Sequence, residues 1–304
     1  MNVNQKLINI KDRIEERSKD SRSEYLKKIK FSSEQSKSAR NNMGCSNIAH
    51  AFASCDKAQQ NQGANGGTVI GVVSAYNDML SAHAPLKDYP DIIKNSAEKR
   101  NAIARVAGGV PAMCDGITQG EPGMELSLFS RDVIALSTAV AFSHNVFDAG
   151  ICLGVCDKIV PGLVIGALSF GHLPIAMLPA GPMPTGISNE EKSSNRKKYA
   201  SGEIDRSALI LSEQSAYHSS GTCTFYGTAN TNQLIMEVMG LQLPSASFYQ
   251  SNSKERQLLI DRTVECILEL NDKDIKMGEM LDSKSWVNSI AVSYTHLTLP
   301  TILL

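Results

Sequence analysis

The chain has 304 residues, of which 42% are hydrophobic and 20% are charged, so it can bury a real core and wholesale disorder is excluded. Its length suits two domains at most. With 30 Lys and Arg against 31 Asp and Glu, the net charge is −1, which gives no electrostatic reason to expect nucleic acid or an anionic membrane as a partner.

The chain contains no apolar stretch of the roughly 20 residues that a membrane-spanning helix needs. Its N-terminus is charged throughout and lacks the hydrophobic region of a secretory signal. These features predict a soluble, cytoplasmic protein. Seven cysteines in such a chain favour metal or redox chemistry over structural disulfides.

Residues 1–40 are expected to form an N-terminal helical extension. They carry 11 Lys and Arg against 6 Asp and Glu, and Leu7, Ile10 and Ile14 recur at helical spacing. A solvated helix packed on the body of the protein, or on a second subunit, is favoured over a free interaction tail.

From residue 66 the pattern changes to alternating strands and helices. Short apolar, β-branched runs predict buried strands, and longer periodic runs predict helices. Ser130 is a plausible N-cap for the helix that follows it, and Pro161 suits the first turn of the next one. The expected strands are 68–75, 149–156 and 173–178, and the expected helices are 91–104, 131–146 and 162–171.

This alternation predicts an α/β fold, with a parallel sheet flanked by helices on both faces. Residues 186–206 are polar and predict a surface loop or an exposed helix, and residues 251–270 predict a charged helix. Residues 293–304 are uncharged and rich in Thr and Leu, so we expect them to be an unrelated tail outside the α/β domain of residues 41–292.

The candidate catalytic and metal-binding residues lie where the expected strands end, because open α/β sheets place their sites at the carboxyl ends of strands. Cys156, Asp157 and Lys158 offer a thiolate, a carboxylate and an amine at one strand end. The thiolate suits iron–sulfur ligation and the carboxylate suits Mg²⁺. Lysine could join a metal site only after carbamylation by CO₂. The competing interpretation is a buried cysteine that precedes a helix cap.

The other cysteines and the histidines are less informative. Small residues surround Cys223 and would leave room for a bulky cofactor, although a buried thiol in a tight turn is equally consistent. Cys45 and Cys55 are further candidates, whereas Cys152 and Cys266 lie in patterns typical of core packing. His50 and His83 follow polar segments and could face a site. No zinc-finger spacing, GxSxG elbow, P-loop or GxGxxG motif occurs.

Four motifs, taken in order, resemble the dihydroxy-acid dehydratase and 6-phosphogluconate dehydratase family. They are CDGITQGEPGMELSLFSRD (114–132), GVCDKIVPG (154–162), PAGPMPTG (179–186) and GTCTFYGTANTNQ (221–233). The segments SAYNDMLSAHAPLKDYP (74–90) and CSNIAHAFASC (45–55) are more similar to the 6-phosphogluconate branch. Ala82 stands where the dihydroxy-acid branch would carry a cysteine ligand.

The resemblance implies a hydro-lyase that dehydrates 6-phospho-D-gluconate to 2-dehydro-3-deoxy-6-phosphogluconate in the Entner–Doudoroff route. It implies an iron–sulfur cluster, 4Fe–4S rather than 2Fe–2S, with Cys156 and Cys223 as ligands. It also implies Mg²⁺ held by Asp115, Asp157 and a carbamylated, catalytic Lys158. The third cluster ligand is left open among Cys45, Cys55 and Cys114.

The resemblance covers residues 40–292, and members of the family are about twice as long as this chain. We therefore expect an N-terminal half, inactive by itself, whose catalytic base and further Mg²⁺ ligand lie in the other half. The full-length protein is expected to act on a small sugar-acid phosphate and to form a homodimer. A dehydratase of another aldonic or dihydroxy acid, and a non-catalytic α/β fragment, are the alternatives.

Overall fold

A four-stranded, all-parallel sheet forms the centre of the structure, a computed structural model that describes residues 4–184, 186–223 and 229–296. The strands lie in the order β2-β1-β3-β4. β1 pairs in parallel with both β2 and β3, and β3 pairs in parallel with β4. The strands are β1 (Val69–Ser74), β2 (Ile103–Gly109), β3 (Ala149–Leu153) and β4 (Ile175–Leu178).

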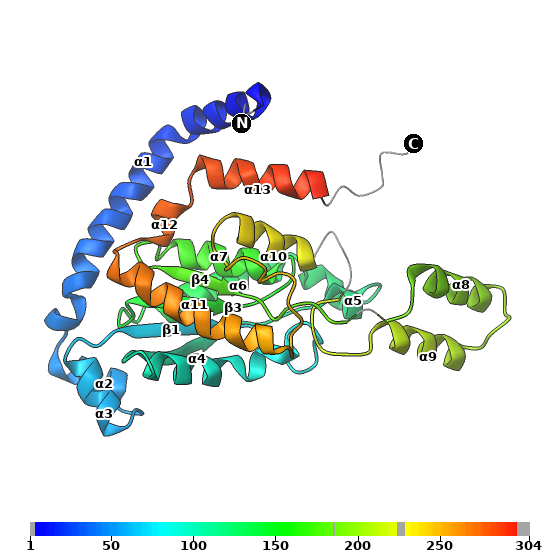
Figure 1. The fold of residues 1–304 in the computed structure, drawn as a ribbon, viewed down its shortest axis with the longest axis horizontal. Coiled ribbons are helices and arrows are strands. Elements are labelled where there is room, and N and C mark those ends of the chain that lie inside the picture. The colour runs from blue at the N-terminus through cyan, green and yellow to red at the C-terminus, as the bar shows by residue number, and fades with distance from the viewer. Residues whose placement is uncertain (1–3, 185, 224–228, 297–304) are drawn as a thin grey trace.

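Helices cover both faces of this sheet, which confirms the predicted α/β fold (Figure 1). On one face lie α6 (Phe129–Phe142) and α7 (Ile159–Leu168), which pack closely on each other. On the other face lie α4 (Tyr89–Glu98) and α11 (Lys254–Asp272). Because water is excluded from both sides, apolar and small residues predominate along the central strands.

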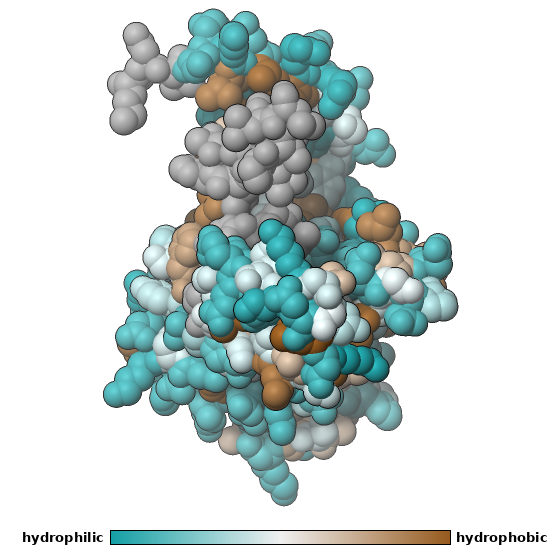
Figure 2. All heavy atoms as spheres, turned by 90° about the vertical axis from the view of Figure 1, so that its right-hand side faces the viewer, coloured by the Kyte–Doolittle hydropathy of each residue, from teal (hydrophilic) through white to brown (hydrophobic). Residues whose placement is uncertain are grey.

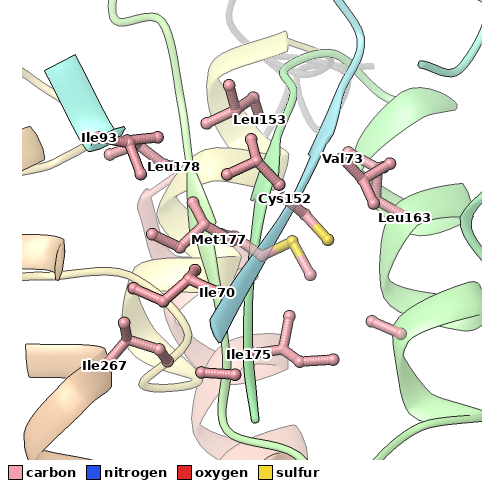
Figure 3. Packing of buried hydrophobic residues seen from close by; sticks show 14 of the residues in the cluster. Ile70, Val73, Ile93, Cys152, Leu153, Leu163, Ile175, Met177, Leu178 and Ile267 are labelled. Carbon is pink, nitrogen blue, oxygen red and sulfur yellow. The ribbon is translucent and has the colours of Figure 1, made fainter. Parts of the chain in front are cut away.

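The core follows from that pattern. Every residue of β1 and of β3 is buried. Figure 3 shows Leu163 of α7 approaching the sheet from one side, and Ile93 of α4 and Ile267 of α11 lying on the other. Successive side chains of a strand point to opposite faces, so one apolar run serves both layers.

A glycine allows α7 to lie close to α6. A Cβ atom on Gly166 would stand 2.6 Å from both the Ala135 carbonyl oxygen and the Thr138 Cβ of α6. Any side chain there would push the two helices apart and open the layer that covers this face of the sheet.

The helix predicted at residues 91–104 is confirmed over its first eight residues, and the prediction was wrong about its end. The helix there, α4, ends at Glu98. Ile103 begins β2, a strand that the sequence analysis did not predict. β2 lies at one edge of the sheet, and within it only Ile103 and Ala104 are buried, while Val106 is exposed. The strand ends in Gly108 and Gly109, residues that disfavour strands. A continuous apolar run, the signal used for the other strands, is therefore absent.

Two helix starts and one strand end also differ from the prediction. α6 begins at Phe129, and Ser130 does not cap it but donates its hydroxyl to the Ser127 carbonyl oxygen at 2.6 Å. α7 begins at Ile159, two residues before Pro161. β3 ends at Leu153, so Cys156 lies in the loop between β3 and α7.

The predicted N-terminal helix is α1 (Gln5–Asn42), and it packs on the body of the protein. Its Tyr25 hydroxyl donates a hydrogen bond to the Leu168 carbonyl oxygen at 2.8 Å, and Ile29 is buried. Figure 1 shows this helix running along the side of the molecule that also carries α12 (Met277–Met280) and α13 (Ser283–His296). These contacts support the packed helix over the free tail.

The polar segment 186–206 contains an exposed helix, as predicted. α8 (Asn189–Ala200) has no buried residue and pairs with α9 (Arg206–Ala216), held by an ion pair of 2.6 Å between Arg196 Nε and Glu213 Oε1. The pair projects from the body near the carboxyl ends of the strands (Figure 1). Figure 2 looks onto this side, and its surface is largely hydrophilic with smaller hydrophobic areas.

The charged segment 251–270 is helical, as predicted, and forms α11. The final helix, α13, runs to His296, and the remaining residues of the segment 293–304 lie outside the described residues. No helix among the described residues has the length and apolar content that crossing a bilayer requires. The other short elements are α2 (Cys45–Phe52), α3 (Lys57–Ala64), η1 (Ala84–Lys87), α5 (Asp115–Thr118), η2 (Pro122–Leu126), α10 (Ala229–Val238), α12 (Met277–Met280) and α13 (Ser283–His296).

Candidate functional site

The carboxyl ends of the parallel strands gather the predicted site residues at one edge of the sheet. Cys114 and Asp115 follow β2, and Cys156, Asp157 and Lys158 follow β3. Cys223 joins them through a bridge to the loop after β4, described below. We refer to this group as the carboxyl-edge site, and it consists of Cys114, Asp115, Cys156, Asp157, Lys158 and Cys223.

Lys158 lies between the two predicted metal-binding carboxylates. Its Nζ contacts Asp115 Oδ2 and lies 2.9 Å from Asp157 Oδ1. The Lys158 side chain is only 5% exposed, whereas each carboxylate is about one-third exposed. Burial alone lowers the pKa of Lys158, but the hydrogen bonds to Asp115 and Asp157 outweigh it, so the pKa is raised. A protonated Lys158 Nζ thus bridges the two carboxylates and offsets part of their combined charge.

Ser127 fixes the second oxygen of Asp115. Its hydroxyl donates to Asp115 Oδ1 at 2.8 Å, which leaves Oδ2 directed at Lys158. Ser127 itself is buried. Sequence reasoning did not single out this residue, because a serine within an apolar segment carries no signal of its partner.

Cys156 occupies a strained backbone position between β3 and α7. Its φ is +76°, a conformation that residues with a side chain rarely adopt and that costs about 1–3 kcal/mol. Strain of this kind persists where the surrounding structure holds it, and it is common at functional sites. Burial raises the pKa of the Cys156 thiol well above its ordinary value, and the neighbouring thiols of Cys223 and Cys114 raise it further.

Backbone hydrogen bonds bring Cys223 to the same edge. Thr222 forms a parallel bridge with Pro182: its N–H donates to the Gly181 carbonyl at 2.8 Å, and its carbonyl accepts from the Met183 N–H at 2.9 Å. Gly221 donates to the Ser81 carbonyl at 2.7 Å, which ties this segment to the loop after β1. Segments that are 140 residues apart in sequence are therefore adjacent beside Cys223.

Gly221 makes this approach possible. Its φ is +128°, and a Cβ atom there would stand only 2.5 Å from the backbone nitrogen of Met183. Only glycine combines this backbone conformation with the required space.

Two of the candidate cysteines lie away from the carboxyl-edge site. Cys45 is exposed at the start of α2, and Cys55 follows that helix and accepts a contact of 2.7 Å from Arg105 Nη1. Residues of α2 line a surface hollow of about 500 Å³ together with Val69, the first residue of β1. This hollow therefore lies at the amino end of the strand, and exposed His50 lines it as well.

His83, predicted as a residue that could face a site, is buried in the segment between β1 and η1. Its side chain is 1% exposed, and its Nδ1 lies 2.9 Å from the Ala75 carbonyl oxygen. Because that oxygen accepts, Nδ1 carries the proton, and Nε2 has no hydrogen-bond partner among the described residues. Burial lowers the pKa of His83 to about 4, so the ring is neutral. Cys152 lies in the core, as predicted, and Cys266 lies on α11.

No three His, Cys, Asp or Glu side chains of the described residues converge on a point where a single ion could bind. At the carboxyl-edge site, two carboxylates contact the Lys158 Nζ. The ligands of an iron–sulfur cluster bind different irons, so its thiolates need not converge on one point.

Comparison with known proteins places these motifs in a family. The family model described as Dihydroxy-acid/6-phosphogluconate dehydratase N-terminal matches residues 68–296, which include every residue of the carboxyl-edge site. The chain belongs to this family. The match confirms the resemblance that the four motifs indicated.

Similar proteins support the same assignment and show its extent. The chain is 50% identical over 289 residues to a phosphogluconate dehydratase of Pseudomonas aeruginosa, covering 94% of this chain and 47% of that protein. It is 49% identical over 297 residues to a phosphogluconate dehydratase of Escherichia coli K12, covering 95% and 48%. A dihydroxy-acid dehydratase of Aquifex aeolicus is 31% identical over 230 residues, covering 74% and 41%. The chain thus spans about half the length of the curated relatives it matches.

Proposed function

We propose that this chain is the N-terminal part of a hydro-lyase that dehydrates 6-phospho-D-gluconate to 2-dehydro-3-deoxy-6-phosphogluconate in the Entner–Doudoroff route. One observation carries the proposal: the carboxyl-edge site joins thiols and carboxylates on a scaffold about 50% identical to proteins named phosphogluconate dehydratase. The higher identity to these proteins than to the dihydroxy-acid dehydratase supports the phosphorylated substrate.

The donor set of the site fits two inorganic groups. Cys156 and Cys223 would hold an iron–sulfur cluster of the 4Fe–4S type, because thiolates are the preferred ligands of such clusters. Asp115 and Asp157 offer the oxygens that Mg²⁺ prefers. When bound, the cluster would supply a Lewis acid for the departing 3-hydroxyl group and Mg²⁺ would stabilise the charge that develops beside the substrate carboxylate.

The chain's own residues would prepare this site. Asp115 and Asp157 hold the Lys158 side chain, and the Ser127 hydroxyl orients Asp115. The fixed backbone of Cys156 directs its thiol from the loop that also carries Asp157. The end of β3 and the start of α7 therefore fix the positions of both the Cys156 thiol and the Asp157 carboxylate.

Lys158 would become a third Mg²⁺ ligand only after it changes its charge. In carbamylation the neutral Nζ amine attacks CO₂, a nitrogen–carbon bond forms, one proton is released, and the product is an anionic carbamate. That anion would stand beside the two carboxylates of Asp115 and Asp157, which the Lys158 ammonium bridges before the reaction. Neighbouring like charges repel, so the carbamate requires a cation such as Mg²⁺ between it and the carboxylates of Asp115 and Asp157. Lysine carbamylation and Mg²⁺ binding should therefore occur together.

A dehydratase for another aldonic or dihydroxy acid is the second candidate, favoured by the 31% identity to a dihydroxy-acid dehydratase. The full-length protein is also proposed to be a homodimer. Turnover by a chain completed to the length of its relatives, reconstituted with iron and sulfide, separates the candidates. We expect 2-keto-acid formation from 6-phosphogluconate and little from gluconate or a 2,3-dihydroxy acid. Equal turnover of gluconate would contradict the phosphate preference, and preference for the dihydroxy acid would support the second candidate.

A further inference from the structure

Three sulfur atoms, rather than two, belong to the carboxyl-edge site. Cys114 immediately precedes Asp115, whose carboxylate contacts the Lys158 Nζ, and Cys156 lies two residues before Lys158 on the other side of that contact. The Asp115–Lys158 contact therefore holds the Cys114 loop against the Cys156 loop. The Cys156 thiol has both Cys223 and Cys114 as electrostatic neighbours.

The loop after β2 presents Cys114 without using its side chain for local structure. Its carbonyl oxygen accepts hydrogen bonds from the N–H groups of Ile117 and Thr118, at 3.0 and 3.2 Å, and so begins the short α5. The Cys114 side chain makes no capping hydrogen bond and is partly exposed. The backbone is thus anchored, while the sulfur stays available.

The other four cysteines do not satisfy these conditions. Cys152 is fully buried within β3, and burial raises the pKa of its thiol to about 12. Cys266 lies on α11, on the face of the sheet away from α7. Cys45 and Cys55 belong to the α2 region at the amino end of β1, where Arg105 contacts Cys55.

We propose that Cys114 is the third protein ligand of the iron–sulfur cluster, together with Cys156 and Cys223. This inference rests on the proposed function, because it presumes that the protein binds a cluster. Three thiolates close together at the carboxyl edge of the sheet would repel one another, and bound iron ions would offset that repulsion. Three ligands for four irons leave one iron without a cysteine, which is the position a substrate hydroxyl would need.

The test compares cluster content across matched variants of the chain completed to the length of its relatives. We expect Cys114→Ser and Cys156→Ser each to lose iron and acid-labile sulfide after anaerobic reconstitution, or to retain a cluster with an altered electron paramagnetic resonance spectrum and faster iron loss to a chelator. Cys266→Ser, on the outer helix, should behave like the unsubstituted protein. Circular dichroism checks that each variant is folded.

A second measurement uses the unsubstituted protein. A thiol alkylating reagent and mass spectrometry should show Cys114 modified in the protein without a cluster and protected once the cluster is present. Exposed Cys45 should be modified in both states and serves as the internal control.

The two proposals fail in different ways. If the unsubstituted protein incorporates no cluster, the proposed function is overturned and this inference with it. If Cys156→Ser loses the cluster while Cys114→Ser keeps its iron content, spectrum and chelator resistance, the assignment of Cys114 alone is overturned. Alkylation of Cys114 at the same rate with and without the cluster would overturn it as well.

Discussion

The Lys158 ammonium contacts the Asp115 carboxylate across two loops that are 43 residues apart in the sequence. One loop follows β2 and the other follows β3, and these strands are not neighbours, because β1 lies between them. The contact therefore spans the middle of the sheet edge. It fixes the two loops that carry Cys114 and Cys156.

This contact should stabilise the fold in the absence of any metal. In a double-mutant cycle, Asp115→Asn and Lys158→Met should show a coupling of about 1–2 kcal/mol, between the values typical of exposed and of buried ion pairs. The expected value is intermediate because Lys158 is buried while Asp115 is one-third exposed. Urea unfolding of the four proteins measures it. As a control, Lys94 and Asp91 form an exposed pair on α4 that should show a coupling near zero. Equal couplings for the two pairs would contradict the expectation.

Asp157 should act on Mg²⁺ without acting on the cluster. We expect Asp157→Asn to retain iron and sulfide but to weaken Mg²⁺ activation of the completed enzyme, by more than the roughly 10–100-fold that loss of an outer partner costs. Titration of turnover with Mg²⁺, alongside iron analysis, provides the measurement. Asp132→Asn, an exposed carboxylate on α6, is the matched control. An unchanged Mg²⁺ dependence would remove Asp157 from the site, and loss of iron would mean that the two sites are not separable.

Gly221 should be needed for the placement of Cys223. The added Cβ of Gly221→Ala would meet the Met183 backbone nitrogen, and alanine disfavours a φ of +128°. We expect this variant to lose cluster binding while its circular dichroism stays close to that of the unsubstituted protein, since the strained segment lies outside the sheet. Gly202→Ala is a control, because Gly202 also has a positive φ but no atom within 4 Å of an added Cβ. If both variants bind the cluster normally, the close approach of Gly221 to the Met183 backbone is not required for cluster binding.

His83 should make stability depend on pH. Its pKa is about 4 in the folded protein because of burial, against 6.5 for an ordinary histidine. The unfolded chain therefore binds more protons between these values, and the free energy of unfolding should fall as pH drops from about 6.5 to about 4, by up to ~3 kcal/mol, and should change no further from this group below pH 4. Unfolding of the unsubstituted protein and of His83→Gln at several pH values tests this. The difference between their free energies of unfolding should narrow or reverse toward pH 4, and a constant difference would contradict the prediction.

The buried elements were predictable from the sequence, because a sheet that is covered on both faces demands continuous apolar runs. The runs at 68–75, 149–156 and 173–178 gave β1, β3 and β4, and the α/β class followed from their alternation with helices. The edge strand β2 was not predicted from the sequence, because it is half exposed and ends in two glycines. Where burial does not dictate side-chain type, the pattern carries little information.

The same distinction holds for the candidate site. Cys156, Asp157 and Lys158 are adjacent in the chain and end a buried run, so local sequence alone marked them as one group. Three other features of the site are properties of the tertiary structure. Ser127 orients Asp115, and Gly221 brings Cys223 to the same edge of the sheet. Cys114 lies in this group, whereas Cys45 and Cys55 lie elsewhere. The strand order β2-β1-β3-β4 decides which loops meet, and that order arises from packing between segments far apart in the chain, which no local pattern of residues encodes.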